Sequence, residues 1–278
     1  EKVENLKSIS RQVVAQMELR KQSIETQGLK EKLENYITSL EEEKHTSERF
    51  LKNLLPGNLS EQWLESGSIA PLYYDEVTIG FTDFVNFTNN SVQGDPAELI
   101  DRLSEYFSSF DGICDLFGVE KLKTIGDSYM FGCGVPERSR HHATLSCLTA
   151  LLFQKQVEEL NKNQENLGRL PWPMRIGIHS GPLMAGIVGK SKISYDVWGD
   201  TVNIASRFEK NSEGKRINIS ESTHYRVNQF FDCTPRGLVD IKGKGATNMF
   251  WLDRIKKEYS GDEEGLIANE RLFKMLSL

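Results

Sequence analysis

Residues 120–135 read EKLKTIGDSYMFGCGV, and this stretch decides the fold of the segment around it. Two short apolar runs flank Gly126-Asp127, a dipeptide typical of tight hairpin turns. The pattern predicts a β-hairpin with strands at 119–125 and 128–134. A turn explains the Gly-Asp pair, but it does not explain Lys123, which occupies an apparently half-buried position in the first strand. The lysine and the carboxylate at the two ends of one strand indicate a function for this hairpin.

Strands and helices alternate on both sides of the hairpin. A β-rich stretch at 74–81 ends in Thr82-Asp83, a helix begins at Asp95-Pro96, and another strand, MRIGIH, spans 174–179 before Ser180-Gly181. Because several hairpins interrupt the alternation, we predict an α+β fold. Its sheet should be ferredoxin-like, mixed and mainly antiparallel, with helices packed on it.

The first 54 residues differ from the rest, since they hold no proline and a single glycine, Gly28. Apolar residues at heptad spacing form a seam whose register shifts near Gly28. The seam residues are Val13, Met17 and Ile24 before the shift and Leu33, Ile37, Leu40, Leu51 and Leu54 after it. We predict two helices joined at a Gly28 hinge in a dimeric coiled coil. A single solvated helix packed on its own domain is the alternative.

These changes in composition divide the chain into four segments. Residues 1–54 form the N-terminal coiled-coil helix, and 55–72 form a linker with a short helix after Pro56-Gly57. Residues 73–256 are long enough to bury a core and form the main domain. Residues 257–278 are a C-terminal extension.

The totals of the chain exclude several classes of partner. It has 278 residues and a net charge of −6, whereas a nucleic-acid-binding protein normally needs a basic face. The four cysteines lack metal-binding or redox spacing, so we expect reduced thiols in a cytoplasmic protein. No apolar run approaches membrane-spanning length, and we expect no membrane segment in this chain.

Two aspartates indicate a metal site. If the strands of Asp83 and Asp127 are neighbours, both carboxylates project from one sheet edge and suit Mg²⁺ or Mn²⁺. Close pairs of such ions serve phosphoryl transfer. The loop FVNFTNN follows Asp83, and its backbone N–H groups, at Phe84, Phe87 and Thr88, are placed to cradle phosphates. Taken singly, each aspartate is an ordinary turn or cap residue.

A second group of polar residues lies in YDVWGDTVNIASR, residues 195–207. Asp200 and Thr201 are placed to cap a helix on which Asn203 and Arg207, four residues apart, share one side. An amide beside a guanidinium suits a sugar and a phosphate, and Arg207 is a candidate for stabilising transition-state charge. Alone, the pair is equally consistent with two surface residues.

Five segments resemble, in order, the motifs of class III nucleotidyl cyclase catalytic domains, over about residues 73–255. They are FTDFVNFT at 81–88, KTIGDSYM at 123–130, GIHSGPLMAGIVG at 177–189, YDVWGDTVNIASR at 195–207 and KGKG at 242–245. The chain departs from the family at Phe84 and Asn86, where Ile and Gly are usual. That departure affects the local turn and the approach of the Phe84 carbonyl to a second metal ion.

The resemblance implies a homodimer with active sites between the subunits. Asp83, Asp127 and the carbonyl of Phe84 would hold two divalent cations, Mg²⁺ or Mn²⁺, on one chain. From the other chain, Asn203 would orient the ribose and Arg207 would stabilise the α-phosphate.

The resemblance also assigns the remaining substrate contacts. Lys242 resembles the lysine that grips the terminal phosphates, with Lys244 as a substitute. Lys123 and Asp196 match the two base-reading positions. Because adenine offers an acceptor at N1 and a donor at its amino group, a lysine and an aspartate suit ATP. Guanine presents the reverse pattern and would leave buried groups unpaired, at about 1–3 kcal/mol each.

These inferences together predict an adenylate cyclase in which the ribose 3′-hydroxyl attacks the α-phosphorus of ATP in line. The stretch LKSISRQVVAQMELR, residues 6–20, resembles the last helix of a GAF-type sensor and implies regulation by an upstream sensor domain. The alternatives are a guanylate cyclase and a non-catalytic cyclase-like domain that dimerises or binds nucleotide. A polymerase-type palm with two acids is disfavoured by the acidic charge.

Overall fold

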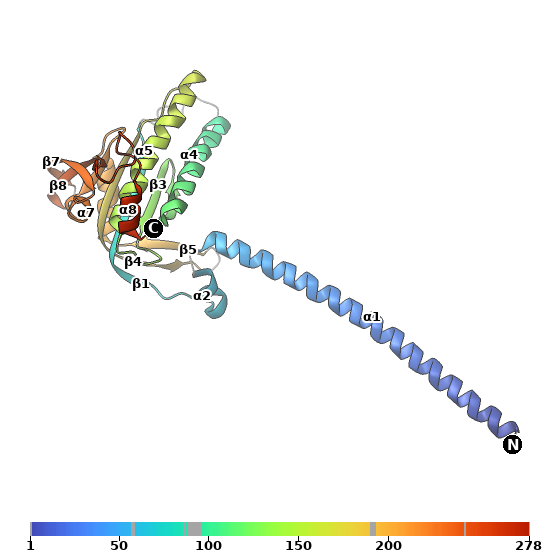
Figure 1. Ribbon diagram of the computed structural model, residues 1–278. Coiled ribbons are helices and arrows are strands. Elements are labelled where there is room, and N and C mark those ends of the chain that lie inside the picture. Colours follow the sequence, from blue (N-terminus) through green and yellow to red (C-terminus); the bar gives the residue numbers. More distant parts are fainter. Residues whose placement is uncertain are drawn as a thin grey trace. The chain divides into compact units, whose positions relative to one another are not determined.

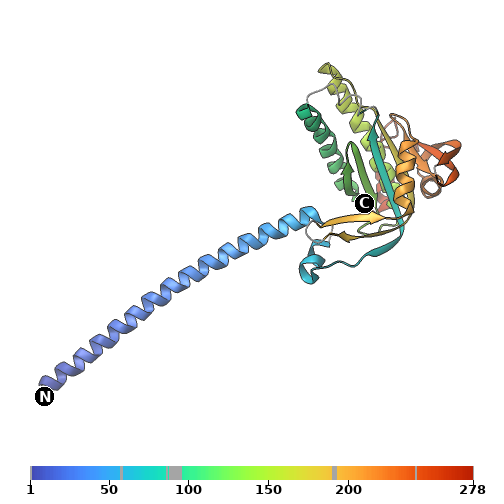
Figure 2. The ribbon, with the colours of Figure 1, turned by 180° about the vertical axis from the view of Figure 1, so that it is seen from behind.

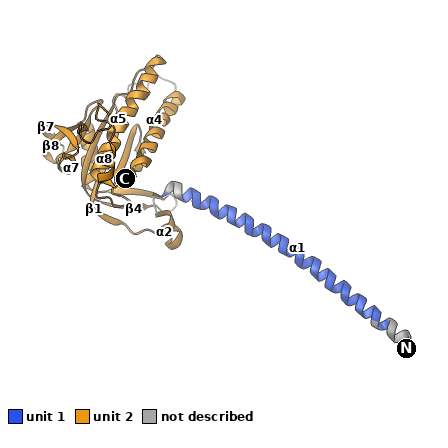
Figure 3. Ribbon diagram, viewed as in Figure 1, with its two compact units in different colours: residues 1–55 blue, residues 56–278 orange. Residues whose placement is uncertain are grey.

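The structure is a computed structural model that describes residues 2–56, 59–85, 87, 96–189, 193–241 and 243–277. The chain divides into two compact units, Glu1–Leu55 and Pro56–Leu278 (Figure 3). Among the helices within those described ranges, none combines the length and the hydropathy that a membrane span requires.

The first unit is one long helix, α1 (Lys2–Leu54). It passes through Gly28 without interruption, so the prediction of two helices joined there is wrong. One glycine costs a helix about 1 kcal/mol, and the strong helix formers on both sides outweigh that cost. The seam side chains from Val13 to Leu40 are exposed, from 47% at Ile37 to 68% at Met17, and Leu51 is half-buried.

The second unit is built on an eight-stranded sheet (Figure 1). Its order is β2-β3-β1-β4-β6-β8-β7, with β5 paired to β4, and among these pairs only β4 and β6 run parallel. The strands are β1 (Leu72–Phe84), β2 (Glu120–Ile125), β3 (Ser128–Cys133), β4 (Met174–Val188), β5 (Ser194–Trp198), β6 (Ile217–Ser220), β7 (Phe231–Ile241) and β8 (Gly245–Ile255). The helices are α2 (Leu59–Ser66), α4 (Pro96–Phe117), α5 (His142–Asn166), α6 (Asp200–Lys210), α7 (Glu221–Val227) and α8 (Glu270–Leu276).

The chain order β1-α4-β2-β3-α5-β4 with the sheet order β2-β3-β1-β4 is a ferredoxin-like arrangement. The predicted α+β fold with a mainly antiparallel sheet is therefore confirmed. The hairpin at Gly126-Asp127 is present, and it pairs Ile125 with Ser128. One strand is longer than predicted, because β4 continues through Ser180-Gly181 to Val188. Pairing with β1 along nearly its whole length holds this segment extended.

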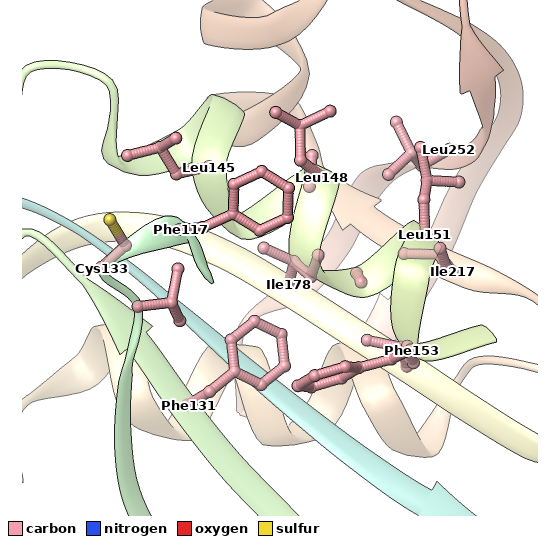
Figure 4. Packing of buried hydrophobic residues seen from close by; sticks show 14 of the residues in the cluster. Phe117, Phe131, Cys133, Leu145, Leu148, Leu151, Phe153, Ile178, Ile217 and Leu252 are labelled. Atoms are coloured by element: carbon pink, nitrogen blue, oxygen red, sulfur yellow. The ribbon is translucent and has the colours of Figure 1, made fainter. Parts of the chain in front are cut away.

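The main core lies between the sheet and the helices α4 and α5, which lie side by side on one face (Figures 1 and 2). Figure 4 shows Phe131, Phe153 and Ile178 packed at its centre. Residues after β8 join the same core, since Leu272 of α8 is fully buried there. The stretch that the sequence marks as a C-terminal extension thus packs against the main domain.

A chain of side-chain hydrogen bonds runs from α5 through β1 and β4 to α7 and the end of β6. It starts where His142 Nδ1 lies 2.6 Å from the Thr78 hydroxyl, and it ends where His179 Nδ1 lies 2.8 Å from the Ser220 hydroxyl. The hydroxyl groups between these ends belong to Thr78, Ser180, Thr223 and Ser220. The two histidines therefore have structural roles.

His179 predicts a pH dependence of stability. Burial lowers the pKa of His179 from 6.5 to about 4. As the pH falls below 6.5 the unfolded chain binds the proton first, so the stability present above that pH is lost toward pH 4. We expect the difference in unfolding free energy between wild type and His179→Gln to shrink by about 3 kcal/mol from pH 7 to pH 4. Urea unfolding measures this difference, and an unchanged value would contradict the prediction.

Candidate active site

The two predicted metal-binding carboxylates lie together. Strands β1 and β3 are neighbours and pair Thr82 with Tyr129, which brings Asp83 beside Asp127 in the β2–β3 turn. Burial raises the pKa of the Asp127 carboxyl, and the negative charge of Asp83 raises it further. The backbone N–H groups of Asp127 and Phe84 oppose this by hydrogen bonding to the carboxylate.

Arg175 is a residue that the sequence analysis missed. It lies opposite Asp83 on β4 and donates two hydrogen bonds to Asp83 Oδ2, at 3.0 Å from Nε and 2.6 Å from Nη2. Its Nε also lies 2.7 Å from Glu209 Oε1 on α6. The available signal was the single charged residue in the apolar strand MRIGIH, but the sequence does not reveal its strand partner.

The carboxylate pair fits a divalent cation. Carboxylate oxygens are the ligands that Mg²⁺ and Mn²⁺ prefer, and a cation would offset both the burial and the Asp83 charge that raise the pKa of Asp127. A guanidinium already lies against Asp83 Oδ2. Within the described residues, no three His, Cys, Asp or Glu side chains gather as a metal site. A cation held here would therefore need further oxygen ligands, such as substrate phosphates.

Helix α6 begins differently from the sequence prediction. Its N-cap is Gly199, with φ 144° and no side-chain cap, so the predicted capping by Asp200 and Thr201 is wrong. Tertiary contacts occupy both side chains instead. The Asp200 carboxylate pairs with Lys244, and the Thr201 hydroxyl donates to the carbonyl of Pro182 at 2.6 Å.

The predicted amide and guanidinium lie on the open side of α6. Asn203 is exposed and Arg207 is half-buried, and their spacing of four puts them on one side of the helix. The opposite side buries Phe208 and Glu209, the latter toward Asp83 through Arg175. A single chain thus has the carboxylates and the amide–guanidinium pair on opposite sides of α6.

Gly177 allows α6 to lie against the sheet. Ile176 and Ile178 point into the main core, so the glycine between them faces α6, where an added Cβ would lie 1.9 Å from the Glu209 nitrogen. Backbone cannot give way like a side chain. We therefore expect Gly177→Ala to displace α6 and to lower the Tm by at least about 5 °C. Gly112→Ala on α4, where nothing lies within 4 Å, is the control and should not lower the Tm. Equal Tm values for the two variants would contradict the prediction.

The two predicted base-reading residues are in direct contact. Lys123 on β2 and Asp196 on β5 are 73 residues apart in sequence, yet the lysine Nζ lies 2.8 Å from Oδ1 and 2.6 Å from Oδ2. Asp196 Oδ1 also accepts a hydrogen bond from the Val197 N–H, which orients the carboxylate. The side chains remain 39% and 20% exposed, so a ligand can reach them.

The remaining predicted residues fall into two groups. The side chain of Phe84 is 2% exposed and packs on Tyr106 and Trp172, and Phe87 also packs on Trp172. Any contact of these phenylalanines with a ligand would therefore use the backbone. Lys242 and Thr88 lie outside the described residues.

Comparison with known sequences places these features in a family. Residues 69–254 match the family described as adenylate and guanylate cyclase catalytic domain. Adenylate cyclase of Mycobacterium tuberculosis is 36% identical over 214 residues, which cover 77% of this chain and 47% of that protein. Retinal guanylyl cyclase 1 of Rattus norvegicus is 35% identical over 229 residues, which cover 81% of this chain and 20% of that protein.

A solved structure is also similar. The guanylate cyclase domain of RhGC from Catenaria anguillulae, in complex with GTP, matches with a TM-score of 0.61 and 32% identity, over 65% of this chain and 97% of that chain. This chain spans about half the length, or less, of the two curated relatives named above. The sequence match, the fold and the paired carboxylates agree: the chain belongs to the adenylate and guanylate cyclase catalytic domain family, the class III nucleotidyl cyclases.

Proposed function

We propose that this protein is an adenylate cyclase that converts ATP to 3′,5′-cyclic AMP and pyrophosphate. The observation that carries the proposal is the contact between Lys123 and Asp196. Relatives of both nucleotide types match at nearly equal identity, 36% and 35%, so overall similarity does not choose the base. The chemistry of this pair supports ATP.

The pair is complementary to adenine. The Lys123 ammonium can donate to N1, and the Asp196 carboxylate can accept from the 6-amino group. Guanine has a donor at N1 and an acceptor at O6. In the same position its N1–H would face the Lys123 ammonium, also a donor, and its O6 would face the Asp196 carboxylate, also an acceptor. Each mismatch leaves a desolvated polar group unpaired, at about 1–3 kcal/mol.

Asp83 and Asp127, with the main-chain carbonyl of Phe84, would hold two divalent cations, Mg²⁺ or Mn²⁺. When bound, such ions lower the pKa of the ribose 3′-hydroxyl and neutralise phosphate charge. Asp83 and Asp127 would act only by holding these ions, and Arg207 donates to the α-phosphate oxygens as charge builds up during in-line attack. Asn203 orients the ribose. Lys242, or Lys244 in its place, binds the terminal phosphates, and backbone N–H groups at Phe87 and Thr88 add to that contact.

A homodimer completes the site in this proposal. The acids and the Asn203–Arg207 pair lie on opposite sides of α6 in one chain, so one nucleotide can contact both sets only if α6 comes from a second copy. The exposed apolar seam of α1 supports pairing of the same two chains as a coiled coil. Through this helix an upstream sensor domain of the GAF type would regulate how the two catalytic domains meet.

Turnover of purified protein tests the proposal. With Mn²⁺ present, we expect cyclic AMP from ATP and a kcat/KM at least about 30-fold higher for ATP than for GTP, from two mismatched groups at about 1 kcal/mol or more each. Chromatography of the products measures both reactions. A preference for GTP would identify a guanylate cyclase, and binding of nucleotide without product would identify a non-catalytic domain.

A further inference from the structure

Arg175 lies between two carboxylates that belong to different parts of the molecule. Asp83 is at the end of β1, at the proposed cation site, whereas Glu209 is in the last turn of α6. Both hydrogen bonds from the guanidinium to Asp83 end on the same oxygen, Oδ2, at 3.0 and 2.6 Å. The guanidinium thus occupies part of the ligand surface that a cation would use.

Glu209 is placed to receive the guanidinium. The residue is 4% exposed, and its Oε1 lies 2.7 Å from Arg175 Nε. The single Nε hydrogen points to Asp83, however, and Oε1 has no hydrogen-bond partner among the described residues. A buried carboxylate oxygen without a hydrogen bond is costly, so it would gain from a small rotation of the guanidinium.

We propose that Arg175 is a switch between the two carboxylates. It holds Asp83 while the cation site is empty, and it transfers its hydrogen bonds to Glu209 when a divalent cation binds Asp83. Arg175 and Glu209 are positioning residues in this role, because they act through Asp83 rather than on the reacting atoms.

The switch would connect cation binding to α6. The Glu209 backbone lies directly against Gly177 on β4, so the helix turn that carries Glu209 is held close to the strand that carries Arg175. A stronger Arg175–Glu209 pair would tighten this contact. The other side of the same helix carries Asn203 and Arg207. If the proposed function is correct, these residues serve the second site of the dimer, and cation binding in one site would thereby order the other.

A double-mutant cycle on cation affinity tests the switch. Calorimetric titration of the full chain with Mn²⁺, without nucleotide, measures the affinity of wild type, Glu209→Gln, Arg175→Gln and the double variant. In the wild-type background, Glu209→Gln removes the negative charge that would hold the displaced guanidinium and should weaken Mn²⁺ binding about tenfold. In the Arg175→Gln background there is no guanidinium to displace, and the same change should alter the affinity less than about twofold.

The cycle distinguishes the switch from simple attraction between Glu209 and the metal. Simple attraction predicts the same loss in both backgrounds, and that result would overturn the proposal. Glu213→Gln, at an exposed position on the chain after α6, is the matched control and should leave the affinity unchanged. If Arg175→Gln does not fold, Arg175→Met replaces it, because methionine fills similar space without a charge that the cation would have to displace.

Hydrogen exchange gives a second measurement. Saturating Mn²⁺ should slow amide exchange in α6 of the wild type, and this protection should be lost in Glu209→Gln at equally saturating Mn²⁺. Equal protection in both proteins would count against the connection to α6. Neither measurement uses turnover, so a chain that binds Mn²⁺ as described but makes no cyclic nucleotide would refute the proposed function and leave the switch in place.

Discussion

Chains carrying Asp83→Ala and chains carrying Arg207→Ala should each be inactive alone, by at least about 1,000-fold, and should regain activity when they form mixed dimers. The two sets of residues lie on opposite sides of α6, so under the proposed function each site would take its acids from one chain and its guanidinium from the other. A mixed dimer then contains one intact site and one site that lacks both groups. With random pairing half of the dimers are mixed, and the mixture should reach about a quarter of wild-type activity.

Two affinity tags make this experiment quantitative. Dimers purified through both tags are all mixed and should show about half of wild-type cyclic AMP formation. The matched control pairs a wild-type chain with a chain that carries both substitutions. That dimer contains the same two mutations, yet each of its sites lacks one required group, so it should be inactive. Mixed dimers of the two single variants that are as inactive as this control would contradict a shared site.

The second large effect concerns the choice of base. Lys123→Glu combined with Asp196→Cys should reverse the nucleotide preference, with a change of at least about 1,000-fold in the ratio of kcat/KM for ATP to that for GTP. Two mismatched groups at about 1 kcal/mol or more each favour ATP by at least about 30-fold in the wild type, and the swap should turn that preference into one of similar size for GTP. Competition between the two nucleotides in one reaction measures the ratio directly.

The single substitutions and a neighbouring lysine provide the controls for this swap. Lys123→Glu alone places a second carboxylate where the ammonium now lies 2.6 Å from Asp196 Oδ2, so it should lower activity with both nucleotides. Lys121→Glu changes the same charge in the same strand, but Lys121 pairs with Asp111 instead. It should leave the ratio unchanged. A folded double variant that keeps its preference for ATP would show that other groups read the base.

The sequence predicted those features whose signals are local. Gly126-Asp127 between two apolar runs is sufficient to predict the hairpin. A two-residue turn needs a positive φ, and few residues other than glycine adopt it readily. The motif at 195–207 likewise placed Asn203 and Arg207 on one side of a helix, since that follows from the helical repeat alone. The pairing of Lys123 with Asp196 came from resemblance to a family, because nothing local connects residues 73 positions apart.

Tertiary structure decided the features that depend on distant partners. Ser180-Gly181 does not end β4, because pairing with β1 holds the strand extended. Gly28 does not break α1 for a local reason instead, since the helix formers on both sides outweigh the cost of one glycine. Helix α6 follows Gly199 without a side-chain cap, because the Asp200 carboxylate pairs with Lys244 from a distant part of the chain. Arg175 is the clearest example. Its place between Asp83 and Glu209 exists only because β1, β4 and α6, which are far apart in the chain, meet at one point.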